Sequence, residues 1–299
     1  MADVNPKQAL SRLVEQIPPS CRDNIVIVGS LAAAYQLLQD QKLSVRTKDV
    51  DCVVAPRIAA ATKGAEVAEA LLQAKWRPRG EGDHSPPGNA STPDDKLPLV
   101  RLYPPDGSDW WVEFLTVPME EGGSQKEWTR LELSAGHFGL RAFEFMSLNA
   151  FKPTLTSIGV RCAKVEMMAL ANMLQHPQIS NQTMSAQIAE RTIKRSNKDL
   201  GRVLSIAHLS KNAVESWAES WEEGLRACFP GRWTQLAQKA GSGMRELLQS
   251  EQDLDEAAHT CTHGLLVNRN VPSEVLQFAG ERVIADAVVD LERRARKFM

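Results

Sequence analysis

The segment that most constrains the fold places a glycine turn between a strand and a helix, ahead of two closely spaced aspartates. NIVIVG, at residues 24–29, is a β-branched run that ends at glycine, and the LAAAYQLLQD after it combines good helix formers with apolar residues at helical spacing. DVDCVVA, which begins at Asp49, alternates and then becomes wholly apolar, as is typical of a strand that enters a core. The order strand, turn, helix, strand predicts an α/β unit.

The remainder of the N-terminal half extends this unit. IAAATKGAEVAEALLQAKW, from Ile58, predicts a second helix, and LVRLY and WWVEFLTV flank a turn-rich link that predicts a hairpin. Residues 78–98 are dense in Pro, Gly, Ser and Asp, which is the composition of a mobile loop, either a flap or an insertion.

Helical patterns dominate after residue 155. Apolar residues recur at spacings of three and four over residues 161–175, 185–210, 213–229 and 271–298. Trp217, Trp221 and Leu225 step by four, and such a stripe indicates core packing. We therefore expect a mixed α+β protein with two domains: residues 1–155, in which helices flank a mixed sheet, and a helical domain of residues 156–299.

Charge and cysteine content exclude several classes of protein. The 35 Lys and Arg residues against 37 Asp and Glu residues leave a net charge of -2, so no global basic field is available to bind nucleic acid. Five scattered cysteines without a CxxC pair argue against a disulfide framework and a zinc ribbon, and they favour a reducing cytoplasm. The N-terminus lacks a secretory pattern, and no apolar run reaches the roughly eighteen residues that span a membrane, so we expect a cytoplasmic protein.

The aspartates indicate a metal site. Asp49 and Asp51 are two apart on a predicted strand, so their side chains point to one face, where two carboxylates repel each other unless a cation lies between them. Oxygen ligands of this kind select Mg²⁺ or Mn²⁺. Glu113, in the apolar WWVEFLTV strand, completes a two-metal platform if it aligns beside them. Gly29 and Ser30 open the helix with backbone N–H groups suited to phosphate.

In this order and spacing, the motifs resemble those of the DNA polymerase β-like nucleotidyltransferase superfamily. RTKDVDCVV, from Arg46, is similar to the Arg-Thr-x-Asp-hydrophobic-Asp segment of AbiE-type (AbiEii-like) toxins of toxin-antitoxin systems. The toxin-like members also carry a lysine at a helix start and a later Lys-Asp pair; here Lys164 and Lys198-Asp199 occupy comparable places. The third acid is glutamate, where the family more commonly has aspartate.

The resemblance implies that residues 1–155 are a nucleotidyltransferase-like domain that moves a nucleoside monophosphate from an NTP to an acceptor hydroxyl. It implies that Asp49, Asp51 and Glu113 are catalytic and hold Mg²⁺, and that Gly29 and Ser30 bind the β and γ phosphates. The resemblance further implies that Lys164 offsets triphosphate charge, with Lys198 and Arg195 as substitutes. It also implies that Asp199 orients the acceptor or acts as a base. The partners implied are tRNA as acceptor and an antitoxin protein.

Other interpretations remain open. The acceptor is alternatively a small molecule such as an aminoglycoside, or a protein side chain, and a noncatalytic binding protein keeping the fold is the alternative outside enzymes. His259, Cys261 and His263 supply only three zinc ligands in a stretch of helical character, so we do not expect zinc there. Trp110 and Trp111 suit nucleobase stacking or, more often, hairpin packing. Basic residues at 292–297 suit RNA phosphates or, more simply, the dipole of their own helix.

Overall fold

The structure is a computed structural model that describes residues 2–38, 42–78, 85–119, 127–179 and 182–299. These residues form two compact units. One comprises Ala2–Ala32 and Thr47–Ala163, and is called the sheet unit; the other comprises Ala33–Arg46 and Lys164–Met299, and is called the helical unit. The domain ranges 1–155 and 156–299 stay a prediction.

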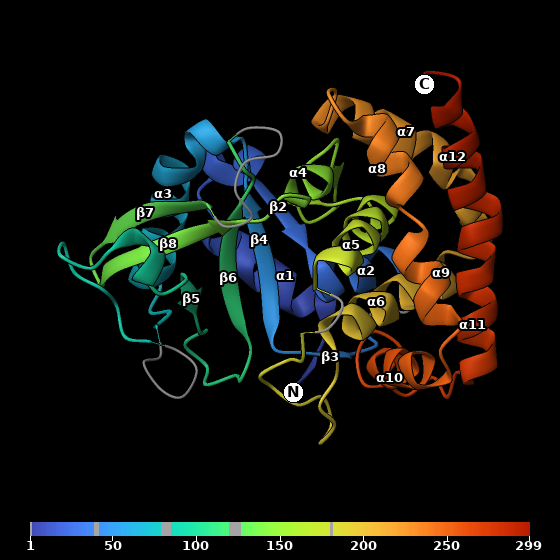
Figure 1. Cartoon of the computed structure of the whole chain (residues 1–299). Coiled ribbons are helices and arrows are strands. Elements are labelled where there is room, and N and C mark those ends of the chain that lie inside the picture. The colour runs from blue at the N-terminus through green and yellow to red at the C-terminus, as the bar shows by residue number, and fades with distance from the viewer. Residues whose placement is uncertain (1, 39–41, 79–84, 120–126, 180–181) are drawn as a thin grey trace. The chain divides into compact units, whose positions relative to one another are not determined.

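The sheet unit is built on a mixed sheet (Figure 1). In the described part of the chain the sheet has eight strands, seven of them in the order β7-β8-β6-β4-β2-β10-β9, with β5 paired to β6. The pairs β2–β4, β7–β8, β9–β10 and β5–β6 are antiparallel, and the pairs β4–β6, β6–β8 and β2–β10 are parallel. The strands are β2 (Ile25–Val28), β4 (Asp49–Val54), β5 (Arg101–Leu102), β6 (Trp111–Thr116), β7 (Glu127–Leu133), β8 (Gly136–Ala142), β9 (Thr154–Leu155) and β10 (Arg161–Cys162).

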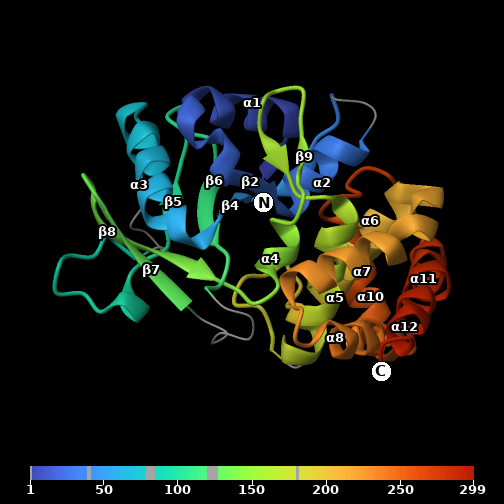
Figure 2. The ribbon, with the colours of Figure 1, turned by 90° about the horizontal axis from the view of Figure 1, so that it is seen from above.

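Helices cover this sheet. The long helix α3 packs on β4, β6 and β7, and α1 packs against α3, so the two lie on the same side of the sheet (Figure 2). The helical segments are α1 (Pro6–Gln16), η1 (Pro19–Asn24), α3 (Arg57–Gln73), η2 (Asp94–Lys96) and α4 (Met146–Asn149). The helix α2 (Gly29–Leu37) begins in the sheet unit, and the short strands β1 (Ala2–Val4) and β3 (Val45–Thr47) complete the N-terminal half.

The strand and turn signals of the opening segment are confirmed. The four residues of β2 are all buried, α2 begins at Gly29, and β4 begins at Asp49. The predicted hairpin forms between β5 and β6. The mixed sheet with its helices and the mostly helical C-terminal part confirm the predicted mixed α+β fold.

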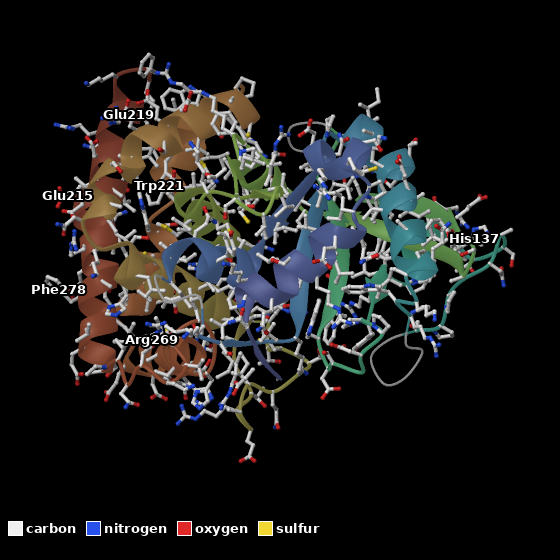
Figure 3. The ribbon with its side chains drawn as sticks, turned by 180° about the vertical axis from the view of Figure 1, so that it is seen from behind. His137, Glu215, Glu219, Trp221, Arg269 and Phe278 are labelled. Atoms are coloured by element: carbon white, nitrogen blue, oxygen red, sulfur yellow. The ribbon has the colours of Figure 1, made fainter. Side chains whose placement is uncertain are left out.

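The helical unit packs its helices around a core of mostly aliphatic side chains that includes the tryptophans of α7. Trp217, Trp221 and Leu225 are each at most 2% exposed, which confirms the predicted stripe. The indole N–H of Trp221, which is labelled in Figure 3, donates to the carbonyl of Glu166 at 2.8 Å. The helices are α5 (Val165–Ile179), α6 (Arg195–Ser210), η3 (Lys211–Ser216), α7 (Trp217–Cys228), α8 (Trp233–Lys239), α9 (Ser242–Leu248), α10 (Glu251–Thr262), α11 (Ser273–Arg282), the π-helical turn η4 (Val283–Val288) and α12 (Val289–Arg296). None of the helices in the described ranges has both the length and the apolar character that crossing a membrane requires.

Two predicted helix starts are wrong. Residues 161–162 form β10, because they pair with β2, and helix α5 follows only at Val165. Residues 185–194 are not helical: Ile188 and Arg191 exchange backbone hydrogen bonds, and Ala189 and Glu190 between them have positive φ. These residues therefore form a tight turn despite their helical apolar spacing, and helix α6 begins only at Arg195.

Residues 78–98, whose composition predicts a mobile loop, are partly held in place by contacts with the sheet. Residues 79–84 lie outside the described residues. Beyond them, Gly88 exchanges backbone hydrogen bonds with His137 of β8, which is labelled in Figure 3, and Asp94 forms an ion pair with Arg130 of β7 at 2.7 Å. This part of the segment is held against the β7–β8 pair, and whether the segment is a flap or an insertion stays open.

Candidate functional site

The sheet brings three carboxylates to one face. Val50 is fully buried while Asp49 and Asp51 on either side are partly exposed, as the period of two in a strand requires. Strand β6 lies parallel to β4 with Glu113 directly opposite Asp51. Because directly paired residues on neighbouring strands point to the same face, Glu113 shares the face of the two aspartates. The predicted alignment of the three acids is therefore present in the register of the sheet.

The glycine turn lies directly beside the second aspartate. Val28, the last residue of β2, is paired with Asp51, and Gly29 follows with φ +76. A Cβ atom at Gly29 would lie 2.6 Å from Oδ2 of Asp51, closer than real Cβ contacts come. Only glycine therefore fits both the backbone conformation and the approach of the carboxylate. Ser30 is the second residue of α2, so the helix begins next to Asp51.

The first aspartate is oriented by a buried threonine. The hydroxyl of Thr47, a residue only 6% exposed, donates to Oδ1 of Asp49 at 3.0 Å. The hydroxyl is neutral, so it fixes the carboxylate without cancelling its charge. Thr47 thus positions Asp49 while leaving its charge available to a cation.

The third carboxylate has a positively charged partner. Arg101 on β5 is paired with Glu113 in the sheet, and its guanidinium Nε forms an ion pair with Glu113 Oε2. The guanidinium carbon also lies 5.9 Å from the ring centroid of Trp111. The Glu113 and Arg101 side chains are 12% and 28% exposed, so solvent screens the pair less than it screens a surface ion pair. The charge of Glu113 is balanced by the protein itself.

The donor set suits a hard divalent cation at the two aspartates. Carboxylate oxygens on one face of β4 are the ligands that Mg²⁺ and Mn²⁺ prefer. Asp51 also lies against the start of α2, so an anion bound at that helix end would face a carboxylate unless a cation separated them. Within the described ranges, no three His, Cys, Asp or Glu side chains are grouped closely enough to hold a metal ion by themselves. Further ligands would have to come from a substrate or water.

The remaining predicted site residues belong to the helical unit. Lys164 directly precedes α5, and its carbonyl accepts from the N–H of Met168 at 3.1 Å. Arg195, Lys198 and Asp199 lie together in the first turn and a half of α6, which packs against α5. Gly29, Ser30 and the three acids therefore belong to the sheet unit, and Lys164, Arg195, Lys198 and Asp199 belong to the helical unit.

Asp199 has an unusual environment within that second set. The residue is 7% exposed, and burial raises the pKa of its carboxyl above the ordinary value, against the opposing effect of Arg202, Lys198 and Arg195. The nearest of these, Arg202, lies 3.5 Å from Asp199 Oδ1. A carboxylate with a raised pKa holds a proton more readily, which suits the predicted role as a base. That role stays a prediction.

The other motifs are explained by packing. His259, Cys261 and His263 lie at the C-terminal end of α10. Nε2 of His259 is hydrogen-bonded to the Ile188 carbonyl at 2.8 Å, and the thiol of Cys261 donates to the Gly201 carbonyl at 3.0 Å.

The hairpin tryptophans and the basic C-terminal helix also have structural partners. Trp110 packs edge-on against Trp76 with ring centroids 5.5 Å apart, and Trp111 packs against Tyr103 at 5.4 Å. In α12, the guanidinium of Arg294 pairs with Asp290 at 2.8 Å.

The sequence assigned no role to Thr47, although it is the Thr of the Arg-Thr-x-Asp-hydrophobic-Asp motif, and did not indicate Arg101. The signal for Thr47 is present, because it stands two residues before Asp49 and therefore on the same side of an extended chain. The signal for Arg101 is weaker: an arginine in the otherwise apolar LVRLY run needs a carboxylate partner, but its partner follows only from the register of β5 on β6.

Comparisons with known proteins provide little further guidance. No protein family model and no curated protein matches this sequence. Among solved structures, one that resembles the chain is the Bradyrhizobium diazoefficiens CD-NTase CdnG in complex with GTP, with 12% identity over 97% of this chain and 90% of that one. The TM-score is 0.21, which is too low to establish a common fold.

Proposed function

We propose that the protein is a divalent-cation-dependent nucleotidyltransferase, which transfers a nucleoside monophosphate from a nucleoside triphosphate to an acceptor hydroxyl and releases pyrophosphate. One observation carries the proposal: Asp49 and Asp51 share a face of β4, and the turn that opens α2 lies directly against Asp51. Sites for a cation and for phosphate are thereby adjacent, which is what charge neutralisation during phosphoryl transfer requires.

The start of α2 would bind the triphosphate. The first backbone N–H groups of a helix have no partner within the helix and point outward, and the helix dipole favours an anion there. Gly29 allows the chain to turn at this point without a side chain between the helix start and Asp51. Ser30 would add its hydroxyl as a donor. The β and γ phosphates would be held here, as the resemblance implies.

Asp49 and Asp51 would hold the cation, with Thr47 fixing the orientation of Asp49. When bound, Mg²⁺ would supply neutralisation of phosphate charge. The prediction that Glu113 helps to hold a second metal ion stays a prediction, since the carboxylate is engaged by Arg101. Lys164, Lys198 and Arg195 as phosphate-binding cations, Asp199 as the group that receives the acceptor's proton, tRNA as acceptor and an antitoxin partner also stay predictions.

The test is transfer of label from each α-³²P-labelled nucleoside triphosphate, with Mg²⁺ and total tRNA, compared between the wild type and Asp49→Asn/Asp51→Asn. This pair of substitutions keeps the shape of the side chains and removes their charge. We expect labelled RNA from the wild type and none from the double variant. Asp23→Asn is the matched control, because Asp23 is an exposed acid of the same unit, paired with Arg161 at 2.9 Å.

Each result separates the alternatives. Label that appears on protein or on a small hydroxyl compound, and not on RNA, keeps the chemistry and changes the acceptor. If no acceptor is labelled but a triphosphate binds with Mg²⁺, the noncatalytic binding interpretation replaces the proposal. Equal activity of the wild type and the double aspartate variant would contradict the assigned site.

A further inference from the structure

The ion pair between Arg101 and Glu113 has a consequence for the number of metal ions. Antiparallel pairing of β5 and β6 sets Arg101 opposite Glu113, and the guanidinium Nε meets the Glu113 carboxylate. The guanidinium carbon also lies 5.9 Å from the centroid of the Trp111 ring, and this cation–π contact restrains the same group. The arginine is therefore part of the sheet's side-chain packing, and a guanidinium group carries a permanent positive charge.

A permanent cation changes what the third acid can bind. A two-metal site needs a carboxylate charge that is free to attract the second ion, and a dication placed beside Glu113 would also lie beside the guanidinium and be repelled by it. Asp49 differs, because its partner Thr47 is a neutral hydroxyl. The acidic face of the sheet, which carries Asp49, Asp51 and Glu113, therefore has two different ends. At Asp49 a cation can bind from solution, whereas at Glu113 the positive charge is already supplied by Arg101.

We propose that the Arg101 guanidinium takes the place of a second metal ion beside Glu113, so that the protein binds a single divalent cation at Asp49 and Asp51. Arg101 is in this sense a positioning residue: it fixes Glu113 and supplies positive charge at that end of the face. The proposal rests on the proposed function, because it assumes that the two aspartates bind a metal ion.

The test counts bound Mn²⁺ ions by electron paramagnetic resonance, using the loss of the free Mn²⁺ signal on titration, without nucleotide. We expect one bound ion in the wild type, and a second in Arg101→Met, which keeps the length of the side chain and removes its charge. Arg101→Lys should restore a count of one. Arg161→Met is the matched control: Arg161 is also paired with an acid of the sheet unit, Asp23, and its loss should leave the count at one.

A second variant makes the test independent of whether Arg101→Met folds. Glu113→Gln should leave one bound ion with an affinity within about threefold of the wild type, since Glu113 is not a ligand of that ion. A two-metal platform would instead lose an ion, or lose at least tenfold in affinity. Thermal unfolding of each variant checks that the sheet unit is intact.

The outcomes distinguish the two levels of inference. Two ions in the wild type, a single ion in folded Arg101→Met, or loss of binding in Glu113→Gln would each overturn the role of Arg101 and leave the nucleotidyltransferase proposal standing. No bound Mn²⁺ in the wild type, together with no label transfer, would overturn the proposed function itself.

Discussion

Replacing Gly29 by alanine tests whether the glycine turn is shaped by Asp51. The new Cβ would lie 2.6 Å from Oδ2 of Asp51, so either the carboxylate or the turn must move. Overpacking of this kind costs about 1–3 kcal/mol of the free energy of unfolding. Alanine at φ +76 adds about 1–2 kcal/mol of backbone strain, partly offset by about 0.4–1 kcal/mol from a less flexible unfolded chain.

Gly107→Ala is the matched control, because Gly107 has φ +81 and a Cβ there would meet nothing within 4 Å. It carries the backbone strain without the clash. The difference in the free energy of unfolding between the two variants, measured by urea denaturation, should therefore be about 1–3 kcal/mol. If Asp51 rotates to relieve the clash, the stability difference shrinks and Mn²⁺ affinity falls at least tenfold instead.

Asp51→Ala removes the atom that the new Cβ would meet. In the double variant Gly29→Ala/Asp51→Ala, the extra cost of Gly29→Ala should disappear, which a double-mutant cycle measures as a coupling energy of about 1–3 kcal/mol. The reasoning would be refuted if Gly29→Ala matched Gly107→Ala in both stability and Mn²⁺ affinity. In that case Asp51 would not be held against the turn.

Two further predictions concern buried polar groups. Thr47→Val should lower Mn²⁺ affinity and cost about 1 kcal/mol of the free energy of unfolding, because Asp49 loses its hydrogen bond, and Thr47→Ser should restore both. Burial lowers the pKa of His176 to about 4, so the unfolded chain binds more protons than the folded chain between about pH 6.5 and 4. The contribution of His176 to the free energy of unfolding should therefore be fully present above pH 6.5 and should fall by roughly 3 kcal/mol towards pH 4. Urea denaturation at several pH values should show a smaller fall for His176→Leu than for the wild type. The same pH dependence in both proteins would contradict this prediction.

Much of the acidic face could be predicted from sequence because its signals are local. The β-branched run before Gly29 and the alternation around Asp49 and Asp51 define β2 and β4, and period two alone puts both aspartates on one face. The alignment of Glu113 required one further step, that two apolar strands of one unit lie side by side.

The features that escaped prediction depend on register or on long-range contacts. The Arg101 pairing follows from which residue of β5 meets which residue of β6, and no local pattern encodes it. Strands β7 and β8 were not predicted, because their alternating buried residues, Leu131 and Leu133 of β7 and Phe138, Leu140 and Ala142 of β8, form short runs interrupted by charged residues and glycine. Residues 185–194 do not form the predicted helix, because Ile188 and Arg191 exchange backbone hydrogen bonds across a turn.

The position of β2 within the sheet has a consequence during synthesis of the chain. Its four buried residues are flanked on one side by β4, made shortly afterwards, and on the other by β10, made only after residue 160. At about 5–20 residues per second, the nascent protein carries an unpaired apolar strand edge for several seconds while the ribosome completes the intervening segment. A chain released before residue 160 would keep this edge, so premature termination would yield an aggregation-prone fragment, and holdase chaperones would be expected to act at this stage.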